Sequence, residues 1–120
     1  MLTAAEQKDV QAIGVRLYNL RKDLGLSREN LAEICDIAVN TIASIETGGK
    51  DIKATTLMKI ASGLGCSTDY LLYGTEHAEN VVKASRLRLL TEKALQELDN
   101  KKLAAYTEQM ESLLKMLSSL

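Results

Sequence analysis

Two short amphipathic patterns, separated only by a tight corner, lie between Ser27 and Gly48 and constrain the fold more than any other feature. Ile42 and Ile45 fall at helical spacing after the corner, and a second apolar set does so before it. Ser27 can accept a hydrogen bond from free N–H groups at a helix start, and Gly48 can end a helix with positive φ. The stretch therefore predicts two short helices that face one core. The apolar positions before the corner are Leu31, Ala32, Ile34 and Cys35.

The composition extends this expectation of helices to the whole chain. Its 120 residues contain no proline, phenylalanine or tryptophan. The core must therefore be built from leucine, isoleucine, valine, methionine and alanine, a set that suits helices better than strands. Because 46% of the residues are hydrophobic, the chain can close one modest core. We predict an all-α protein with one small domain and an appendage.

Three further helical patterns complete a predicted bundle of five helices within residues 1–74. Apolar residues at steps of four, three and four mark an amphipathic helix over about residues 10–24. A fourth helix is expected over residues 57–64, and Ser67 offers an N-cap for a short fifth helix. The glycines that end these three helices are Gly25, Gly65 and Gly74.

Residues 75–120 are expected to form a separate helical region, in which Asp99 and Asn100 mark a break between two helices. Apolar residues of the last helix alternate steps of three and four, a pattern typical of helices that pack along their length. The seam is too short for a free-standing coiled coil. We predict that it mediates dimerisation; a helical hairpin, or packing back on the same domain, is the alternative. The seam residues are Leu103, Tyr106, Met110, Leu113, Leu117 and Leu120.

The two cysteines and the N-terminus bear on the compartment. Cys35 and Cys66 lie far apart, each in an apolar helical context, so both are expected to be buried, reduced thiols. The N-terminal residues are polar, and no segment has the length needed to cross a bilayer. We expect a cytoplasmic protein that does not associate with membranes.

The sequence offers little that supports catalysis or cofactor binding. His77 is the only histidine and lies in the polar junction, so no histidine pair or metal cluster can form around it. The run Gly48-Gly49-Lys50 lacks the preceding strand and the glycine pattern of a nucleotide site. We expect no enzyme activity, metal or cofactor, and no small-molecule ligand is evident.

The formal net charge of −1 counts against a protein held to nucleic acid by overall charge. The local charge differs from the net charge, however, because several basic residues of the first half flank the predicted helix pair. A local basic rim on a neutral protein is therefore expected. The basic residues concerned are Arg16, Arg21, Lys22, Arg28, Lys50, Lys53 and Lys59.

Four motifs follow one another from Ile13 to Gly74: I-G-x-x-L-x-x-L-R, L-G-L-S-x-x-x-L-A, T-I-A-S-I-E-x-G and T-L-M-K-I-A-S-G-L-G-C-S-T-D-Y-L-L-Y-G. In this order and at these separations they resemble the phage repressor and Cro-like class of helix-turn-helix proteins, also called the xenobiotic-response-element type. The resemblance implies a five-helix DNA-binding bundle whose third helix docks in the major groove, usually as a dimer on two-fold related half-sites. It predicts a sequence-specific transcriptional regulator, expected to repress as a homodimer on double-stranded DNA.

The resemblance also implies which residues of the third helix meet the base edges. Asn40 is the strongest candidate, since an amide can pair with adenine N7 and N6 together. Val39 can press on a thymine methyl group. The full set of implied base contacts is Val39, Asn40, Ala43 and Ser44.

A second implied set contacts phosphate and fixes the register on DNA. Ser27 and Arg28 open a helix whose N-terminal N–H groups and dipole favour an anion. An arginine there adds a strong charged hydrogen bond. The implied phosphate contacts are Ser27, Arg28, Thr41, Thr47 and Lys50.

Arg21 and Glu46 are implied to form an internal ion pair that holds the third helix at its angle. The chain departs from the family pattern at Asp36, where glycine is usual, at Ala38, which lacks a capping hydroxyl, and at Ile52, which replaces a proline. The reading helix also contains no lysine or arginine. These departures predict either modest affinity for each half-site or a reading surface that works mainly through short polar and methyl contacts. Pairing two half-sites through the C-terminal helices would then be needed for useful binding.

A protein-interaction module with the same fold is the main alternative. The neutral charge and the uncharged reading helix favour it. Binding to random duplex DNA discriminates the two functions, because phosphate contacts make the affinity fall steeply with salt.

Overall fold

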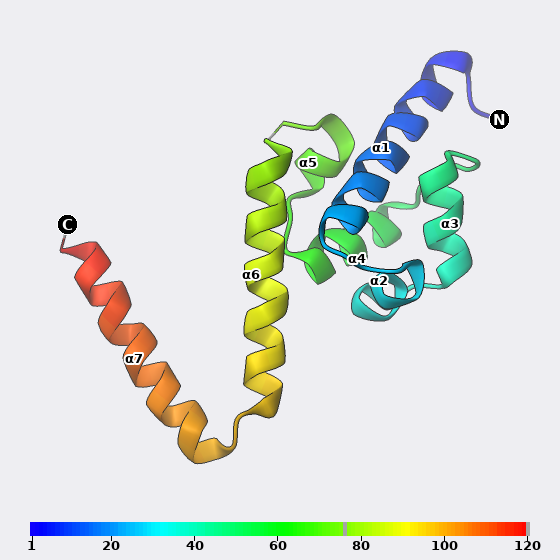
Figure 1. Ribbon diagram of the computed structural model, residues 1–120. Coiled ribbons are helices and arrows are strands. Elements are labelled where there is room, and N and C mark those ends of the chain that lie inside the picture. The colour runs from blue at the N-terminus through cyan, green and yellow to red at the C-terminus, as the bar shows by residue number, and fades with distance from the viewer. Residues whose placement is uncertain (76, 120) are drawn as a thin grey trace. The chain divides into compact units, whose positions relative to one another are not determined.

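The computed structural model describes residues 1–75 and 77–119 and confirms the predicted all-α class over them. Figure 1 shows α1 to α5 gathered around one another in the N-terminal part of the chain. Leu120, one of the predicted seam residues, lies outside the described residues. The helices are α1 (Ala4–Asp23), α2 (Arg28–Cys35), α3 (Val39–Thr47), α4 (Ala54–Leu64), α5 (Thr68–Tyr73), α6 (Ala78–Glu97) and α7 (Asn100–Ser118).

Ser27, Ser67 and Gly48 cap helices as predicted, and Asp99, which was predicted only to mark a break, caps a helix as well. The side chains of Ser27, Ser67 and Asp99 each accept a backbone hydrogen bond at the start of a helix. Gly48 ends α3 in the left-handed conformation, with φ of 70°. The caps therefore confirm the expected starts of α2, α5 and α7 and the expected end of α3.

Helix α1 begins earlier than predicted. Thr3 Oγ1 accepts from the Glu6 backbone N–H at 3.1 Å, and Thr3 N–H donates to the Glu6 carboxylate at 2.8 Å. This reciprocal capping box starts the helix at Ala4 rather than near residue 10. Residues 4–9 are exposed and include no large apolar side chain, so apolar periodicity could not reveal this part of the helix.

The core is the apolar cluster that the helical spacing predicted. Helix α1 packs on α3 and α5, and α2 packs on α3 and α4. Leucine and isoleucine side chains from these helices fill the space between them. The largest fully buried apolar side chains are Leu17, Leu20, Leu31, Ile42, Ile60, Leu64 and Leu71.

The N-terminal compact unit runs from Met1 to Arg88 and extends past the expected domain end at residue 74. The first half of α6 belongs to it, because Val81 and Ser85 are buried. Arg86 Nη2 also donates to the backbone oxygen of Asp23, at the end of α1, at 2.9 Å. These contacts join segments that are distant in sequence, so local sequence patterns do not reveal them. The polar junction therefore looked like the domain boundary.

The second unit, residues 89–120, contains the end of α6 and the whole of α7. Within α7, every residue of which the structure describes, none is buried. Met110 and Leu113 of the predicted seam are 46% and 47% exposed. The unit therefore presents apolar side chains on its surface. No helix among the described residues is both long enough and apolar enough to cross a membrane.

The cysteine thiols form no disulfide. Cys35 is buried as expected, whereas Cys66 is only half-buried because it lies at the edge of the core, and neither belongs to a disulfide. Burial, with a smaller contribution from Cys66, raises the pKa of the Cys35 thiol to about 12. Cys35 therefore stays protonated near neutral pH and acts as a small core residue.

Gly14 allows α1 and α3 to approach closely. A Cβ placed there would collide with the backbone oxygen of Ile45 in α3. We expect Gly14→Ala to lower the free energy of unfolding by about 1–3 kcal/mol, because the clash exceeds alanine's better helix propensity. Urea denaturation measures the change. Gly49→Ala is the matched control, since a Cβ at Gly49 meets only Thr47 Oγ1, at 3.6 Å. Equal midpoints for the two variants would contradict this account of the helix approach.

Candidate nucleic-acid interface

Helix α3 follows a sharp corner and exposes one edge. Asp36 adopts the left-handed conformation at the corner, with φ of 54°, as expected for the residue that replaces glycine. Ala38 occupies the N-cap of α3 and makes no side-chain capping bond, as predicted. Ile42 and Ile45 anchor the helix in the core. The corner therefore turns the start of α3 outward.

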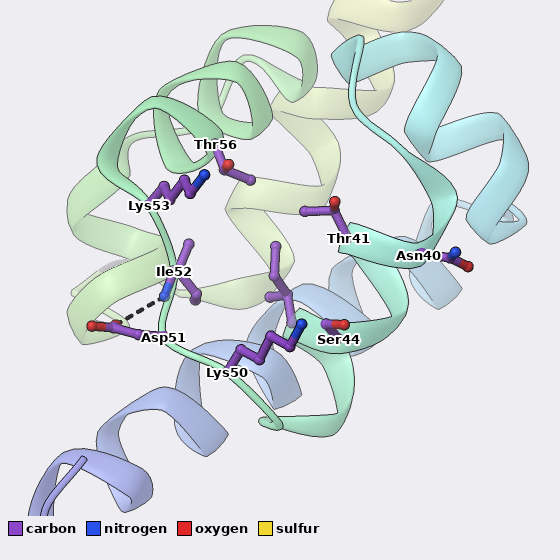
Figure 2. A pocket seen from close by; sticks show the side chains of 9 residues that line it. Asn40, Thr41, Ser44, Lys50, Asp51, Ile52, Lys53 and Thr56 are labelled. Carbon is purple, nitrogen blue, oxygen red and sulfur yellow. Dashed lines mark hydrogen bonds between the residues drawn. The ribbon is translucent and has the colours of Figure 1, made fainter. Parts of the chain in front are cut away.

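The predicted base-reading residues lie on or near this outward edge. Asn40 is exposed and Val39 is 37% exposed. Ala43 and Ser44, one turn further, are half-buried. Figure 2 shows the Asn40 amide directed away from the neighbouring loop. The first turn of α3 is consequently the most accessible part of the predicted reading surface.

An open cleft of about 290 Å³ separates α3 from the loop that leads into α4. Lys50 and Lys53 bring two positive charges to the loop side, while Thr41 and Ser44 face it from α3 (Figure 2). Asp51 turns its carboxylate to the Ile52 backbone N–H, at 2.8 Å. The cleft therefore has the charge and polarity to accept an anion beside the reading helix.

Lys53 and Thr56 of this cleft were not among the predicted phosphate contacts. The sequence marked Lys53 only as a basic residue near the helix pair, and it marked Thr56 only as the first residue of the fourth motif, with no sign of a contact. Lys53 is the N-cap residue of α4. Its place beside the cleft therefore depends on where that helix begins, which the sequence did not fix. Ile52, which replaces the family's proline, packs partly buried against the core.

The N-terminus of α2 borders a second recess, which includes Arg21, Lys22 and Arg28 in its lining. Ser27 Oγ accepts from the Asn30 backbone N–H at 3.0 Å and donates to Asn30 Oδ1 at 2.6 Å. The Ser27 hydroxyl is thus engaged in capping. The anion-facing donors at this end are the first backbone N–H groups of the helix and the arginine beside them.

The Glu46 carboxylate is buried and bound by two arginines. Arg21 donates through Nε to Oε2 at 2.7 Å and through Nη2 to Oε1 at 2.9 Å, which confirms the predicted ion pair. Arg28 donates through Nε to Oε1 at 3.0 Å, a bond that sequence reasoning did not predict. The side chains of Glu46, Arg21 and Arg28 are 1%, 8% and 39% exposed.

Charge stabilisation in this cluster outweighs the cost of burial. Burial by itself raises the pKa of Glu46, but the hydrogen bonds and charges of Arg21 and Arg28 lower it below the ordinary value. The hydrogen bond to Glu46 raises the pKa of Arg21 although burial opposes the shift. Glu46 is therefore a carboxylate and Arg21 a cation at neutral pH.

Two further predicted residues have internal partners. The Thr47 hydroxyl donates to the backbone oxygens of Ala43 and Ser44, at 3.0 and 3.2 Å. It must leave these carbonyls before it can donate to a phosphate. Arg16, counted in the expected basic rim, donates instead to the backbone oxygens of Leu71 and Leu72 at 2.8 and 2.6 Å. Arg16 therefore satisfies backbone carbonyl groups near the C-terminal end of α5.

Comparison with known proteins matches the part of the chain that contains these sites. The sequence model of a family described as Helix-turn-helix matches residues 17–71. An uncharacterised HTH-type transcriptional regulator of Rickettsia conorii is 36% identical over 72 residues, which cover 60% of this chain and 58% of that protein. The HTH-type transcriptional regulator ImmR of Bacillus subtilis is 30% identical over 87 residues, covering 72% of this chain and 68% of ImmR.

A solved structure shares the fold of about half of the chain. The restriction-modification controller protein C.AhdI from Aeromonas hydrophila matches with a TM-score of 0.51 and 28% sequence identity. The match covers 53% of this chain and 97% of the controller protein. The matching region spans little more than half the length of the rickettsial relative.

Proposed function

The chain belongs to the helix-turn-helix family, and from this membership we propose that it is a transcriptional regulator that binds double-stranded DNA through α3. The relatives named above are transcriptional regulators, and the solved structure is a controller protein. The single observation that carries the proposal is the accessible first turn of α3, with Asn40 exposed beside a cleft that holds Lys50 and Lys53.

The roles of the individual residues follow from their positions. Asn40 and Val39 read base edges in the major groove, with Ala43 and Ser44 one turn behind them. Arg28 and Lys50 contact phosphates on either side of α3, and Lys53 adds a charge in the same cleft as Lys50. Lys50 and Lys53 line one cleft and Arg28 lines a second recess, so local positive charge supports binding of an anionic duplex by a chain of net charge −1.

The protein acts in the cytoplasm as a repressor that occludes a promoter, and it binds as a homodimer. Two-fold symmetry places two copies of α3 on half-sites about 34–36 Å apart, or a multiple of that spacing. The apolar seam of α7 supports the dimer, because its residues Tyr106, Met110, Leu113 and Leu117 are about half exposed in the single chain. Linking two half-sites compensates for the modest affinity expected of each.

Two substitutions separate base reading from phosphate binding. Asn40→Ala is expected to relax the preference at one or two base pairs, losing about 1–3 kcal/mol of discrimination. Arg28→Ala is expected to weaken binding to all sequences alike and to reduce the salt slope by about 1 for each phosphate that is no longer neutralised. Selection of bound duplexes from a random pool, followed by binding isotherms at two salt concentrations, measures both effects.

The same experiment tests the function itself. Glu33→Ala, which removes an exposed carboxylate of α2, is the control and should select the wild-type sequence. An unchanged selected sequence for Asn40→Ala would show that Asn40 is not the reader. If the wild-type chain bound duplex DNA with no salt dependence, the protein-interaction function would replace the one proposed.

A further inference from the structure

Glu46 connects three parts of the interface through one buried carboxylate. It lies near the C-terminal end of α3, while its partners Arg21 and Arg28 come from the end of α1 and the start of α2. Arg21 alone would suffice to neutralise Glu46, since it binds both carboxylate oxygens. The bond from Arg28 to Oε1 therefore calls for a reason beyond burial of the carboxylate.

The two arginines differ in which guanidinium nitrogens they leave available for an outside acceptor. Arg21 uses Nε and Nη2 on Glu46, and its Nη1 donates to the backbone oxygen of Leu26 at 3.0 Å. The hydrogen bonds that Arg28 makes among the described residues use only Nε. Its side chain is also 39% exposed, against 8% for Arg21. The terminal nitrogens of Arg28 are thus accessible to an outside acceptor.

The local charge favours an anionic acceptor. Two guanidinium groups and one carboxylate leave a net charge of +1 in the cluster, and the exposed share of it lies on Arg28. Lys22 lines the same recess as Arg28, and the start of α2 directs its first N–H groups there. Among the described residues that line this recess, Glu29 is the one carboxylate.

We propose that Glu46 is a positioning residue for DNA binding: it fixes the Arg28 guanidinium at the start of α2 so that its terminal nitrogens meet a backbone phosphate. This inference rests on the proposed function and deepens it. A guanidinium can donate to a carboxylate and a phosphate at once from one rigid plane, which a lysine ammonium cannot do with the same geometry. A side chain held in place before binding also loses less conformational freedom when DNA arrives.

Glu46→Gln tests the proposal through the sign of its effect. Removing a negative charge near the DNA should by itself tighten binding, because less repulsion opposes the phosphates. Loss of positioning should weaken binding instead. We expect the variant to bind a random duplex about threefold to tenfold more weakly than the wild type, as typical coupled contacts do.

A double-mutant cycle separates positioning from general damage to the fold. In an Arg28→Ala background, Glu46→Gln should not weaken binding to the random duplex, because there is no guanidinium left to position. A merely structural role for Glu46, acting through Arg21 and α3, would weaken binding equally in both backgrounds. Additive effects in the cycle would therefore overturn the proposal.

Arg28→Lys provides a second test that leaves the Arg21–Glu46 pair in place. It preserves the charge, so the salt slope should stay the same, while the affinity should fall about threefold or more. If the Arg28→Lys variant bound DNA as tightly as the wild type, the proposal would be overturned even if Glu46→Gln failed to fold. Glu33→Gln, an exposed carboxylate of α2, is the matched control and should leave the affinity near wild type.

The outcomes also distinguish the inference from the function on which it rests. Circular dichroism confirms that each variant is folded at the temperature of the binding assay. A wild-type chain that bound no duplex DNA at low salt would refute the proposed function and this inference together. Steep, salt-dependent binding by the wild type, with an additive cycle, would refute the positioning role alone.

Discussion

Replacing Glu46 with alanine is expected to lower the free energy of unfolding by about 3–5 kcal/mol, the range for breaking a buried ion pair. The substitution leaves Arg21 with a side chain that is 8% exposed and no carboxylate to bind. Arg28 suffers less, because its side chain already reaches solvent. Chemical denaturation, followed by helical circular dichroism, measures the change in the free energy of unfolding.

Two control variants make this result interpretable. Glu33→Ala removes an exposed carboxylate and should change stability by no more than about 0.5 kcal/mol. Replacing both partners, with Arg21→Met and Glu46→Leu together, should restore much of the stability, since neither charge is then buried alone. If Glu46→Ala were no more harmful than Glu33→Ala, the carboxylate would not be holding α1 and α3 together.

The pH dependence of stability gives the same pair a second readout. Because the pKa of Glu46 is lowered in the folded protein, its stabilising contribution is fully present above the unfolded value, about 4.3, and is lost as pH falls through the folded value. Glu46→Gln should therefore lose less stability than the wild type on acidification below about pH 4.3. The difference between the wild type and Glu46→Gln in stability across this pH range reports the stabilising contribution of ionised Glu46 directly.

Local signals made the five-helix bundle predictable. Ser27, Ser67 and the glycines after α3, α4 and α5 act within one or two turns of their own helices, so short stretches of sequence carry the information. Spacing of leucine and isoleucine then identified the face that each helix buries. The accessible edge of α3 followed, because the residues left over from the core are those that face outward.

Contacts between distant residues were predictable only in part. The pair of Arg21 with Glu46 followed from a family resemblance, but nothing in the spacing indicated that Arg28 would share the carboxylate. Arg16 looked like a surface cation until α5 brought two carbonyl oxygens to it. The position of Ser85 in the core likewise depends on how α6 meets the bundle. Such contacts arise from the packing of whole helices, which periodicity does not specify.

The seam of α7 presents apolar side chains that a second copy of the chain can cover. Met110 and Leu113 are about half exposed, and Leu117 is 56% exposed. All three fall on one stripe of the helix, at the steps of three and four that packed helices share. In the proposed dimer, a symmetric pair of such stripes would bury both, and it would give a regulator with the predicted modest half-site affinity a second point of attachment to DNA.

Changing Met110 and Leu113 together to glutamate is therefore expected to convert the proposed dimer to a monomer and to weaken binding to a two-half-site duplex by about 10²- to 10⁴-fold, the gain that linked sites provide. Two carboxylates in the seam repel their counterparts and cannot be buried without partners. Sedimentation gives the mass, and isotherms on whole and half operators give the affinity.

Ser112→Glu adds a charge to α7 beside the stripe rather than in it, so it should leave both the mass and the affinity unchanged. The half-site affinity of the double variant should also match the wild type, because α3 lies in the other compact unit. A double variant with the wild-type mass would place the dimer contact elsewhere. A wild-type monomer that the two glutamates destabilise would instead favour packing of α7 on its own chain, and the protein would then bind each half-site independently.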